Sequence, residues 1–419
     1  MRNSFRSTAS EGFVTAGILA LLLNDNPLQQ YAEHTCRIYQ EDEVTITETS
    51  GGPKYSAPLF TYEPILQLEQ DPSDLESLLF RPGKFTRGPD GSYYMMDRGN
   101  HRIAVFDDNG LYVRSFGGQG AGPGTFLSPS FQALHGDVLH IHDFQLNRTT
   151  RMRLDGSFID VLIRPRLARP ARRYQLSGNR QLLLHRDDVF GDKNHWQKEV
   201  LTIVDAEFDT LVHVKTDSVL TMVRGADPVY QGRSFWLVRF RGIPCSDYSP
   251  TRGIYLTNGQ TPVINRYNNV GNLIGRIVLD LPPTPVTRKE RRSIIAELNR
   301  KVRERTGLER QIAREVRDNL TIPDVKGWWQ QMMIDDGGFI WLEVVGDDGT
   351  QTEVGDGSLC DIISPDGEYL GRTRLPTMFD RCVVIDGCIC ANLYDSETDE
   401  YRPTVFRIHS AVEGLKYPN

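Results

Sequence analysis

Two histidines and an aspartate stand together in one short apolar run, and they form the most metal-like group of the chain. The run reads His140-Ile141-His142-Asp143. In a strand, His140 and His142 project to one face, where imidazoles can bind a divalent ion, and Asp143 can orient or supplement them. His185, in the equivalent strand of a later repeat, would be a further ligand.

A comparison with an earlier repeat favours a packing role for the same residues. Tyr94 and Met96 stand at the places matched by His140 and His142, and their side chains are expected to pack. We therefore predict packed neutral histidines and no cofactor. The alternative is one divalent metal ion held by His140, His142 and Asp143.

The aspartates of the two repeats end their strands where the chain must turn. A short carboxylate there can accept hydrogen bonds from turn amides, which favours a structural role for Asp97 and Asp143. Repeat-defining contacts are expected from Asn100 and Arg102, matched by Asn147 and Arg151. The residues considered for ligand binding are Asp97, Asp143, His140, His142, His185, Trp328 and Trp329.

Trp328 and Trp329 follow a helical segment directly. Packing between repeats is the default role of such aromatic residues, because each buries a large apolar area. The alternative is that the pair lines the mouth of a pocket beneath the helices.

Basic residues concentrate in two segments of a chain whose net charge is −7. Residues 164–173 hold five arginines and no acid, and residues 288–317 hold eleven basic residues against five glutamates. These side chains either solvate an outer face or bind an anionic partner, such as phospholipid head groups, a polysaccharide or an acidic protein. Nucleic acid is disfavoured, because neither segment interleaves aromatic residues. The predicted partner-binding residues are Arg164, Arg166, Arg169, Arg172, Arg173, Arg288 and Arg292.

The elements that carry these residues are predicted by a periodic pattern of turns. Hydrophobic residues make up 39% of the chain, which suffices for a folded core. Short apolar or alternating runs are separated by glycine-containing turns in two interleaved series, and four strands per period are typical of a propeller blade. One series runs through Gly91, Gly136, Gly178, Gly232, Gly337 and Gly387, and the other through Gly110, Gly156, Gly271 and Gly367.

The pattern predicts an all-β fold, a six-bladed β-propeller over residues 60–410. The last blade lacks its outermost strand, and the strand-like run 60–68 is expected to pair with 404–409 and close the ring. The predicted blades span 81–116, 126–163, 172–215, 228–279, 327–374 and 377–409.

The first repeat resembles a known family. Residues 97–107 read D-x-x-N-x-R-I-x-V-F-D, and a G-x-G-x-G-P-G-x-F run follows over 118–126. These motifs are similar to those of NHL-type six-bladed β-propellers, and the second repeat matches them less well. The resemblance implies a binding scaffold in many members and a lyase or lactonase in some relatives, so it implies no single activity.

Residues 285–320 interrupt the β pattern. Thr287 and Glu290 form a capping box, and Ile294, Ile295, Leu298 and Val302 are expected to share one apolar stripe. Gly307 separates a second helix. This helical insertion between blades four and five is expected to cover one face of the ring as a lid or to project as an arm.

The first 31 residues are interpreted as a signal peptide or a flexible N-terminus. Arg2 and Arg6 precede an apolar run from Phe13 to Leu23, which is too short to span a bilayer as a helix. The pattern predicts export to the periplasm or the extracellular space. The alternatives are a short buried helix or a wrongly chosen start codon, which would leave the protein cytoplasmic.

Four of the six cysteines are crowded near the C-terminus: Cys360, Cys382, Cys388 and Cys390. If Asp386-Gly387 is a hairpin turn, Cys388 and Cys390 share one face while Cys382 points to the other, which disfavours a metal site. Buried thiols are the favoured interpretation, and a bridge from Cys360 to this hairpin is the alternative.

The sequence thus favours a non-enzymatic binding scaffold whose ligand or partner site lies on a propeller face beside the basic helical insertion. The partner would be a small ligand, a glycan or a protein. The alternative is a metal-dependent propeller lyase or lactonase with its site at the central channel. Elemental analysis separates the two, because only the enzyme would hold a metal that a His142→Ala variant loses.

Overall fold

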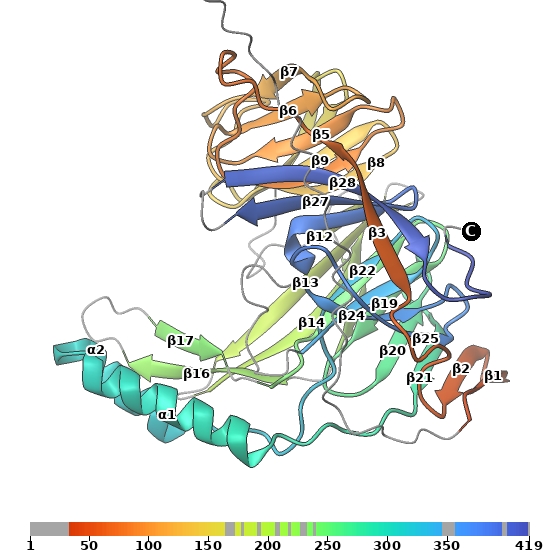
Figure 1. Ribbon diagram of the computed structural model, residues 1–419, viewed down its shortest axis with the longest axis vertical. Coiled ribbons are helices and arrows are strands. Elements are labelled where there is room, and N and C mark those ends of the chain that lie inside the picture. Colours follow the sequence, from red (N-terminus) through yellow and green to blue (C-terminus); the bar gives the residue numbers. More distant parts are fainter. Residues whose placement is uncertain are drawn as a thin grey trace, which may run out of the picture.

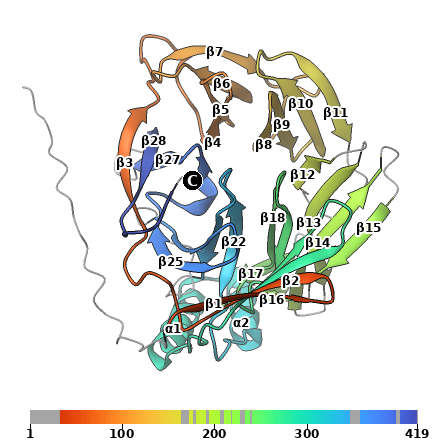
Figure 2. The ribbon, with the colours of Figure 1, turned by 90° about the vertical axis from the view of Figure 1, so that its right-hand side faces the viewer.

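Six β-sheets stand around a common centre, each with its first strand nearest the centre and its last strand at the rim (Figure 2). The chain is therefore a six-bladed β-propeller, as predicted. The computed structural model describes residues 33–163, 172–176, 180–190, 194–205, 210–216, 219–226, 233–237, 240–345, 357–395 and 400–417. The predicted signal segment, residues 1–31, lies outside the described residues.

Each blade has an antiparallel core of four strands, and blades three and four carry additional strands. In chain order the blade strands are β4 (Pro82–Arg87), β5 (Tyr93–Asp97), β6 (Arg102–Phe106) and β7 (Tyr112–Gly117); β8 (Pro129–His135), β9 (Val138–Asp143), β10 (Arg148–Arg153) and β11 (Phe158–Ile163); β12 (Arg172–Gln175), β13 (Gln181–Phe190), β14 (Asn194–Val204) and β15 (Thr210–Lys215); β18 (Cys245–Ser249), β19 (Gly253–Thr257), β20 (Val263–Tyr267) and β21 (Leu273–Leu279); β22 (Trp329–Ile334), β23 (Ile340–Val344), β24 (Leu359–Ile363) and β25 (Tyr369–Arg374); β26 (Cys382–Ile385), β27 (Cys388–Asp395), β28 (Glu400–Ser410) and β3 (Phe60–Gln67).

The core lies between neighbouring blades, which explains why whole strands are apolar. Successive side chains of a strand point to opposite faces. In β5, Tyr93 and Met95 pack with Cys390 of blade six, while Tyr94 and Met96 pack with the apolar side chains of blade two. Both faces of the blade are therefore buried.

The ring closes as predicted, through a strand from near the start of the chain. β28 pairs antiparallel with β3, in a register that runs from Thr404 opposite Gln67 to Ser410 opposite Phe60. Closure joins the N-terminal and C-terminal parts of the described chain in one sheet and leaves no open edge between blades six and one.

The predicted start of blade four, at residue 228, is wrong. The run expected to begin that blade forms β17 (Arg233–Leu237), which pairs with β16 (Val219–Ala226). β16 in turn pairs with β14 of blade three, and blade four begins at β18. The physical reason is that β13 and β14 run on beyond their blade and offer an edge that captures these two strands.

A hairpin that the sequence analysis left unassigned lies at the rim of blade four. It consists of β1 (Thr35–Glu41) and β2 (Val44–Ser50), and β2 runs parallel to β21. His34, just before the hairpin, lies 3.1 Å from Glu368 of blade five through its Nε2 atom. The hairpin therefore bridges two blades from outside.

The helices lie between β21 and β22 and project from the ring beside β16 and β17 (Figure 1). α1 spans Arg288–Glu304 and α2 spans Gly307–Asn319. The capping box of Thr287 and Glu290 is present. We call α1, α2, β16 and β17 the helical lobe. Among the described residues, neither helix is long and apolar enough to cross a membrane.

A small apolar core of its own holds the two helices together. It joins Ile294 and Leu298 of α1 to Ile312 and Val316 of α2. Ile295 was expected on the same apolar stripe but is 48% exposed. It follows Ile294 directly, so its side chain points away from the buried face of the helix.

Candidate functional site

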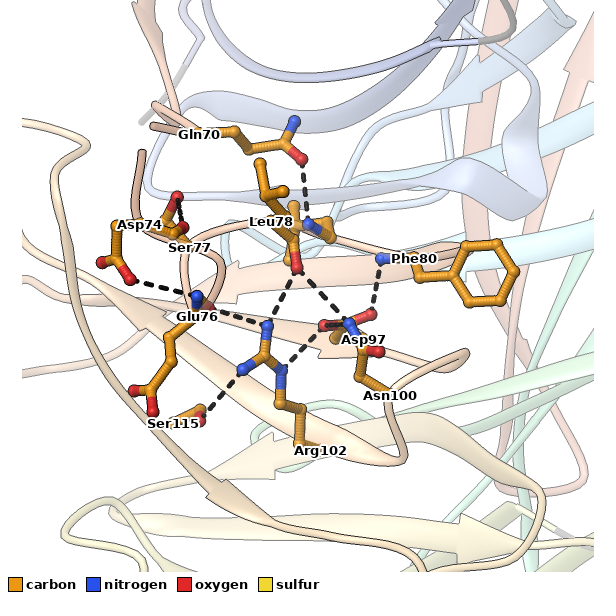
Figure 3. A network of polar contacts seen from close by, with 11 residues as sticks. Gln70, Asp74, Glu76, Ser77, Leu78, Phe80, Asp97, Asn100, Arg102 and Ser115 are labelled. Atoms are coloured by element: carbon orange, nitrogen blue, oxygen red, sulfur yellow. Dashed lines mark hydrogen bonds and ion pairs between the residues drawn. The ribbon is translucent and has the colours of Figure 1, made fainter. Parts of the chain in front are cut away.

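The D-x-x-N-x-R motif of blade one forms a polar network that fastens the preceding loop to the blade (Figure 3). Asp97 is fully buried at the end of β5. Its Oδ1 accepts from the backbone N–H of Phe80 at 2.9 Å, and its Oδ2 accepts from Asn100 Nδ2 at 2.8 Å and from Arg102 Nε at 2.9 Å. The carboxylate thus has a structural role, as the sequence favoured.

The guanidinium of Arg102 completes this network from β6. Its Nη2 donates to the carbonyl oxygens of Glu76 at 2.8 Å and Leu78 at 2.9 Å, and its Nη1 donates to Ser115 Oγ at 3.4 Å. One ion pair therefore fixes the loop of residues 69–81, which joins blade six to blade one.

Blade two holds its own preceding linker by a related set of contacts. Asp143 Oδ2 accepts from the backbone N–H groups of Leu127 at 2.7 Å and Ser128 at 3.1 Å, and Oδ1 accepts from that of Leu146 at 2.9 Å. Arg148 donates to three carbonyl oxygens of the linker, those of Ala121, Gly122 and Thr125.

The predicted matches within blade two are therefore shifted. Arg148, opposite Asp143 in the sheet, takes the place of Arg102, whereas Arg151 pairs with Asp160. Asn147 has a left-handed φ of 49°. It therefore matches His101, with its φ of 55°, and not Asn100. The predicted match of Asn100 is thus one residue out of register, and that of Arg102 is three residues out.

Blade six contacts the same region from the other side. Asn392 of β27 is 1% exposed, and its Nδ2 donates to the carbonyl oxygens of Pro82 at 2.8 Å and Gly83 at 3.3 Å. Side chains of blades one, two and six thus fix the start of β4 and the two loops beside it.

These fixed segments enclose a cavity of about 670 Å³, which we call the channel-mouth cavity. Four cations line it, namely Arg81, Lys84, Arg98 and Arg381, and among the described lining residues Asp380 carries the single carboxylate. The remaining lining residues are Phe80, Pro82, Gly83, Gly99, His101, Leu127, Ser128, Pro129, Ser130, Asn392 and Tyr401.

The backbone is constrained at two of the lining residues, Gly99 and Arg81. The N–H of Gly99 donates to the carbonyl of Phe80 at 2.7 Å, and a Cβ atom at Gly99 would lie 2.1 Å from the Phe80 ring. Arg81 has a φ of 51°, a left-handed conformation that costs a residue with a side chain roughly 1–2 kcal/mol. Such an outlier is maintained only where its surroundings fix it.

The lobe stands on the same face of the ring as this cavity. β13 is the second strand of its blade, as β5 is of blade one, and Asp97 lies at the C-terminal end of β5. The C-terminal end of β13 extends beyond its blade on the face of the ring where Asp97 lies, and the lobe is attached there. On α1, Arg288 and Arg292 are exposed. Arg164, Arg166 and Arg169 lie outside the described residues, as do the side chains of Arg172 and Arg173 in β12.

His140 and His142 lie on one face of β9, as the spacing predicts, and are 3% and 4% exposed. The ring of His142 packs edge-on against Phe144 with centroids 4.7 Å apart. Asp143 points to the other face, where its two oxygens accept the three amide hydrogen bonds described above. The side chain of His185 lies outside the described residues. The described part of the chain has no group of three metal-binding side chains, and elemental analysis still decides the metal alternative.

Trp329 does not line a pocket mouth. It is fully buried between blades four and five, and its Nε1 donates to Asp361 Oδ2 at 2.9 Å. Trp328 packs against the same core while staying partly exposed. The packing role, favoured by the sequence, applies to Trp329.

The cysteine hairpin has the predicted geometry. Cys382 pairs with Ala391 in register and packs with Cys360, whereas Cys388 and Cys390 face the core of blade one. All six thiols are free. Burial raises the pKa of the Cys382 thiol to about 12, as expected of a packed residue.

Sequence reasoning missed Arg98 and, in blades one and six and the loop between them, Arg81, Lys84, Arg381 and Asn392. Arg98 occupies a variable position of the D-x-x-N-x-R motif, so inspection of those variable positions could have identified it. The other four residues stand at unremarkable places in the sequence, and only the closed ring brings them together.

The comparisons with known proteins concern the fold. The profile of the family DUF5128, described as a 6-bladed beta-propeller, matches residues 86–219, which is less than half of the chain. No curated protein sequence matches significantly. The family is described by its fold and not by NHL repeats, so the NHL resemblance stays a prediction.

Three solved structures are similar at low identity. A candidate exported protein from Bacteroides fragilis has a TM-score of 0.48 at 10% identity and covers 86% of this chain and 99% of its own. A member of the DUF4221 family from Bacteroides vulgatus has a TM-score of 0.45 at 10% identity, with coverages of 84% and 99%. A virginiamycin B lyase from Staphylococcus aureus has a TM-score of 0.37 at 9% identity, with coverages of 79% and 81%. At these values the three structures say nothing of what this chain binds.

Proposed function

We propose that this chain is a non-enzymatic binding protein that holds a small anionic ligand in the channel-mouth cavity. The observation that carries the proposal is the charge of the lining, four cations against one carboxylate, in a chain whose net charge is −7. Positive charges gathered in a concave site with low-dielectric walls focus their electric field on an incoming anion.

The rigidity of the walls supports the same proposal. Asp97 and Asn392 fix the segment around Arg81 and Lys84, and Asp143 fixes the wall at Leu127 and Ser128, before any ligand arrives. A preorganised site loses less conformational entropy on binding, so more of the interaction energy appears as affinity.

Inorganic pyrophosphate is a suitable probe, because it is a compact polyanion. Isothermal titration calorimetry at low ionic strength is expected to show one site per chain. Arg98→Gln removes one charged hydrogen bond and should weaken binding roughly tenfold, since such a bond contributes about 1.5 kcal/mol. Added salt should weaken binding to the natural protein as well.

The matched control is Arg153→Gln. The Arg153 side chain is 57% exposed and lies near Asp137, at the opposite end of β10 from the cavity. This variant should bind pyrophosphate like the natural protein. Equal affinity of the Arg98→Gln and Arg153→Gln variants, or no binding by the natural protein, contradicts the proposal.

We also infer export, from the arginines and the apolar run that precede residue 24. Expression of the full chain in a bacterium and mass spectrometry of the product test this. A product shortened at its N-terminus and recovered outside the cytoplasm supports export, and a cytoplasmic product that begins at Met1 opposes it.

A further inference from the structure

We propose that the ligand of the channel-mouth cavity is a planar aromatic anion, whose ring lies in a second hollow next to the cavity. This inference rests on the proposed function and specifies the ligand class. The second hollow has a volume of about 600 Å³ and shares Phe80, Arg81 and Tyr401 with the channel-mouth cavity. The two spaces therefore meet at one rim.

The lining of the second hollow differs in chemistry from that of the cavity. Leu68, Pro72, Leu78 and Leu79 form the apolar part of its wall, beside polar side chains. The amides of Gln67 and Gln70 complete the wall, and Gln70 is already engaged, since its Oε1 accepts from the backbone N–H of Leu79 at 2.9 Å. The second hollow therefore offers apolar side chains to an organic group together with polar groups that can orient it.

Apart from Arg81 on the shared rim, the charged residues that line the second hollow are Glu400 and Arg402, and their charges balance. Arg402 pairs with Asp395 at 3.2 Å and with Glu400 at 3.4 Å. The net positive charge is therefore concentrated in the neighbouring cavity. A molecule that occupies both spaces needs an anionic end in one and an uncharged end in the other.

The shared rim favours a planar group over an aliphatic chain. The Phe80 side chain is 56% exposed on this rim. The Arg81 guanidinium lies over its ring, 5.4 Å from the centroid. Aromatic rings and guanidinium groups both stack on planar ligands. The backbone of Phe80 is held at both its N–H and its carbonyl, by Asp97 and Gly99, so the ring is presented by a fixed support.

Calorimetry with two probes tests the inference, namely inorganic phosphate and 1-naphthyl phosphate. The natural protein should bind 1-naphthyl phosphate roughly tenfold more tightly than phosphate, because stacking and apolar burial add to the charge term. Phe80→Ala should weaken the binding of 1-naphthyl phosphate more than that of phosphate and so remove most of this preference. Arg98→Gln should weaken the binding of both probes.

Phe144→Ala is the matched control, because Phe144 is a 49% exposed aromatic residue on blade two that lies outside both hollows. It should retain the preference. If the natural protein binds both probes equally, or if Phe80→Ala weakens both equally, the aromatic inference fails while anion binding stands. If neither probe binds, the proposed function fails as well.

Discussion

Blades one and two fasten the loops that precede them with the same two positions of the sheet but with different chemistry. In blade one the carboxylate of Asp97 pairs directly with Arg102. In blade two Asp143 accepts only from backbone amides among its described contacts, and Arg148 donates to carbonyls of the linker. A repeat position can thus keep its task while its partners change.

The difference follows from the two loops. The linker before blade two already has backbone hydrogen bonds of its own. Gly118 donates to His101 of blade one, Phe126 donates to Gly118, and Gly120 donates to Phe126. The loop before blade one also has backbone bonds, from Glu69 to Gly110 and within residues 71–77, but its second half is fastened to the blade by the side-chain network of Figure 3 and the Gly99 contact. The ion pair of Asp97 and Arg102 therefore holds the part of the loop that its other backbone bonds leave unattached to the blade.

Removal of the two carboxylates should give the largest contrast. Asp97→Ala leaves Arg102 with an uncompensated charge, only 14% exposed, and should cost about 3–5 kcal/mol of unfolding free energy. Asp143→Ala leaves unpaired amides but no unpaired ion, and should cost about 1–3 kcal/mol. Urea unfolding measures both values. Equal losses would contradict the distinction between the two blades.

An alanine placed two residues after each aspartate should have a smaller effect, and only in blade one. Gly99→Ala places a Cβ against Phe80 and should cost about 1–3 kcal/mol through overpacking, with weaker pyrophosphate binding because the cavity wall shifts. Gln145→Ala, at the exposed matching position of blade two, should leave stability and binding unchanged. Thermal unfolding and calorimetry test both, and a neutral Gly99→Ala would show that this wall is soft.

The shifted register in blade two can be checked with two arginines. Arg148→Met loses hydrogen bonds to three carbonyls and should cost about 1–2 kcal/mol. Arg151→Met loses a pair with Asp160, which is 41% exposed, and should cost less than about 1 kcal/mol. If the order of the two losses in urea unfolding is reversed, Arg151 is the better match to Arg102.

An ion pair outside both blades should give the smallest effect. Burial acts to raise the pKa of Glu368, but hydrogen bonds from Lys54 and His34 outweigh it and hold the pKa below its ordinary value. Because the folded-state pKa is lowered, this carboxylate stabilises the fold above the ordinary pKa of about 4.3 and loses that effect as the pH falls through the folded value. Glu368→Gln should lower Tm slightly at pH 7 and not near pH 3. A larger deficit at pH 3 than at pH 7 would contradict this sign.

The sequence predicted the ring because its signals are local. Glycine turns and apolar runs such as Tyr93 to Met96 mark a blade by themselves, and the strand-like run 60–68 was available to complete the last blade. Blade four was misplaced because the run 233–237 has the composition of a strand, and composition does not say which sheet a strand joins. That choice depends on the length of β13 and β14.

The candidate site was less predictable, because its parts are distant in sequence. Lys84 and Arg98 belong to blade one, while Arg381 and Asn392 come from near the C-terminus. Each stands in an ordinary local context. By contrast, the His140-Ile141-His142-Asp143 run suggested a metal site because its residues are adjacent in sequence. In the strand, however, the alternation of side chains points Asp143 away from the two histidines.

The most direct test of the anion site is anomalous diffraction from crystals soaked in sodium tungstate. Our account predicts a tungsten peak inside the channel-mouth cavity, next to Lys84, Arg98 and Arg381. A cavity without tungsten, in crystals where the ion binds only elsewhere, such as beside Arg288 and Arg292 of α1, would contradict it.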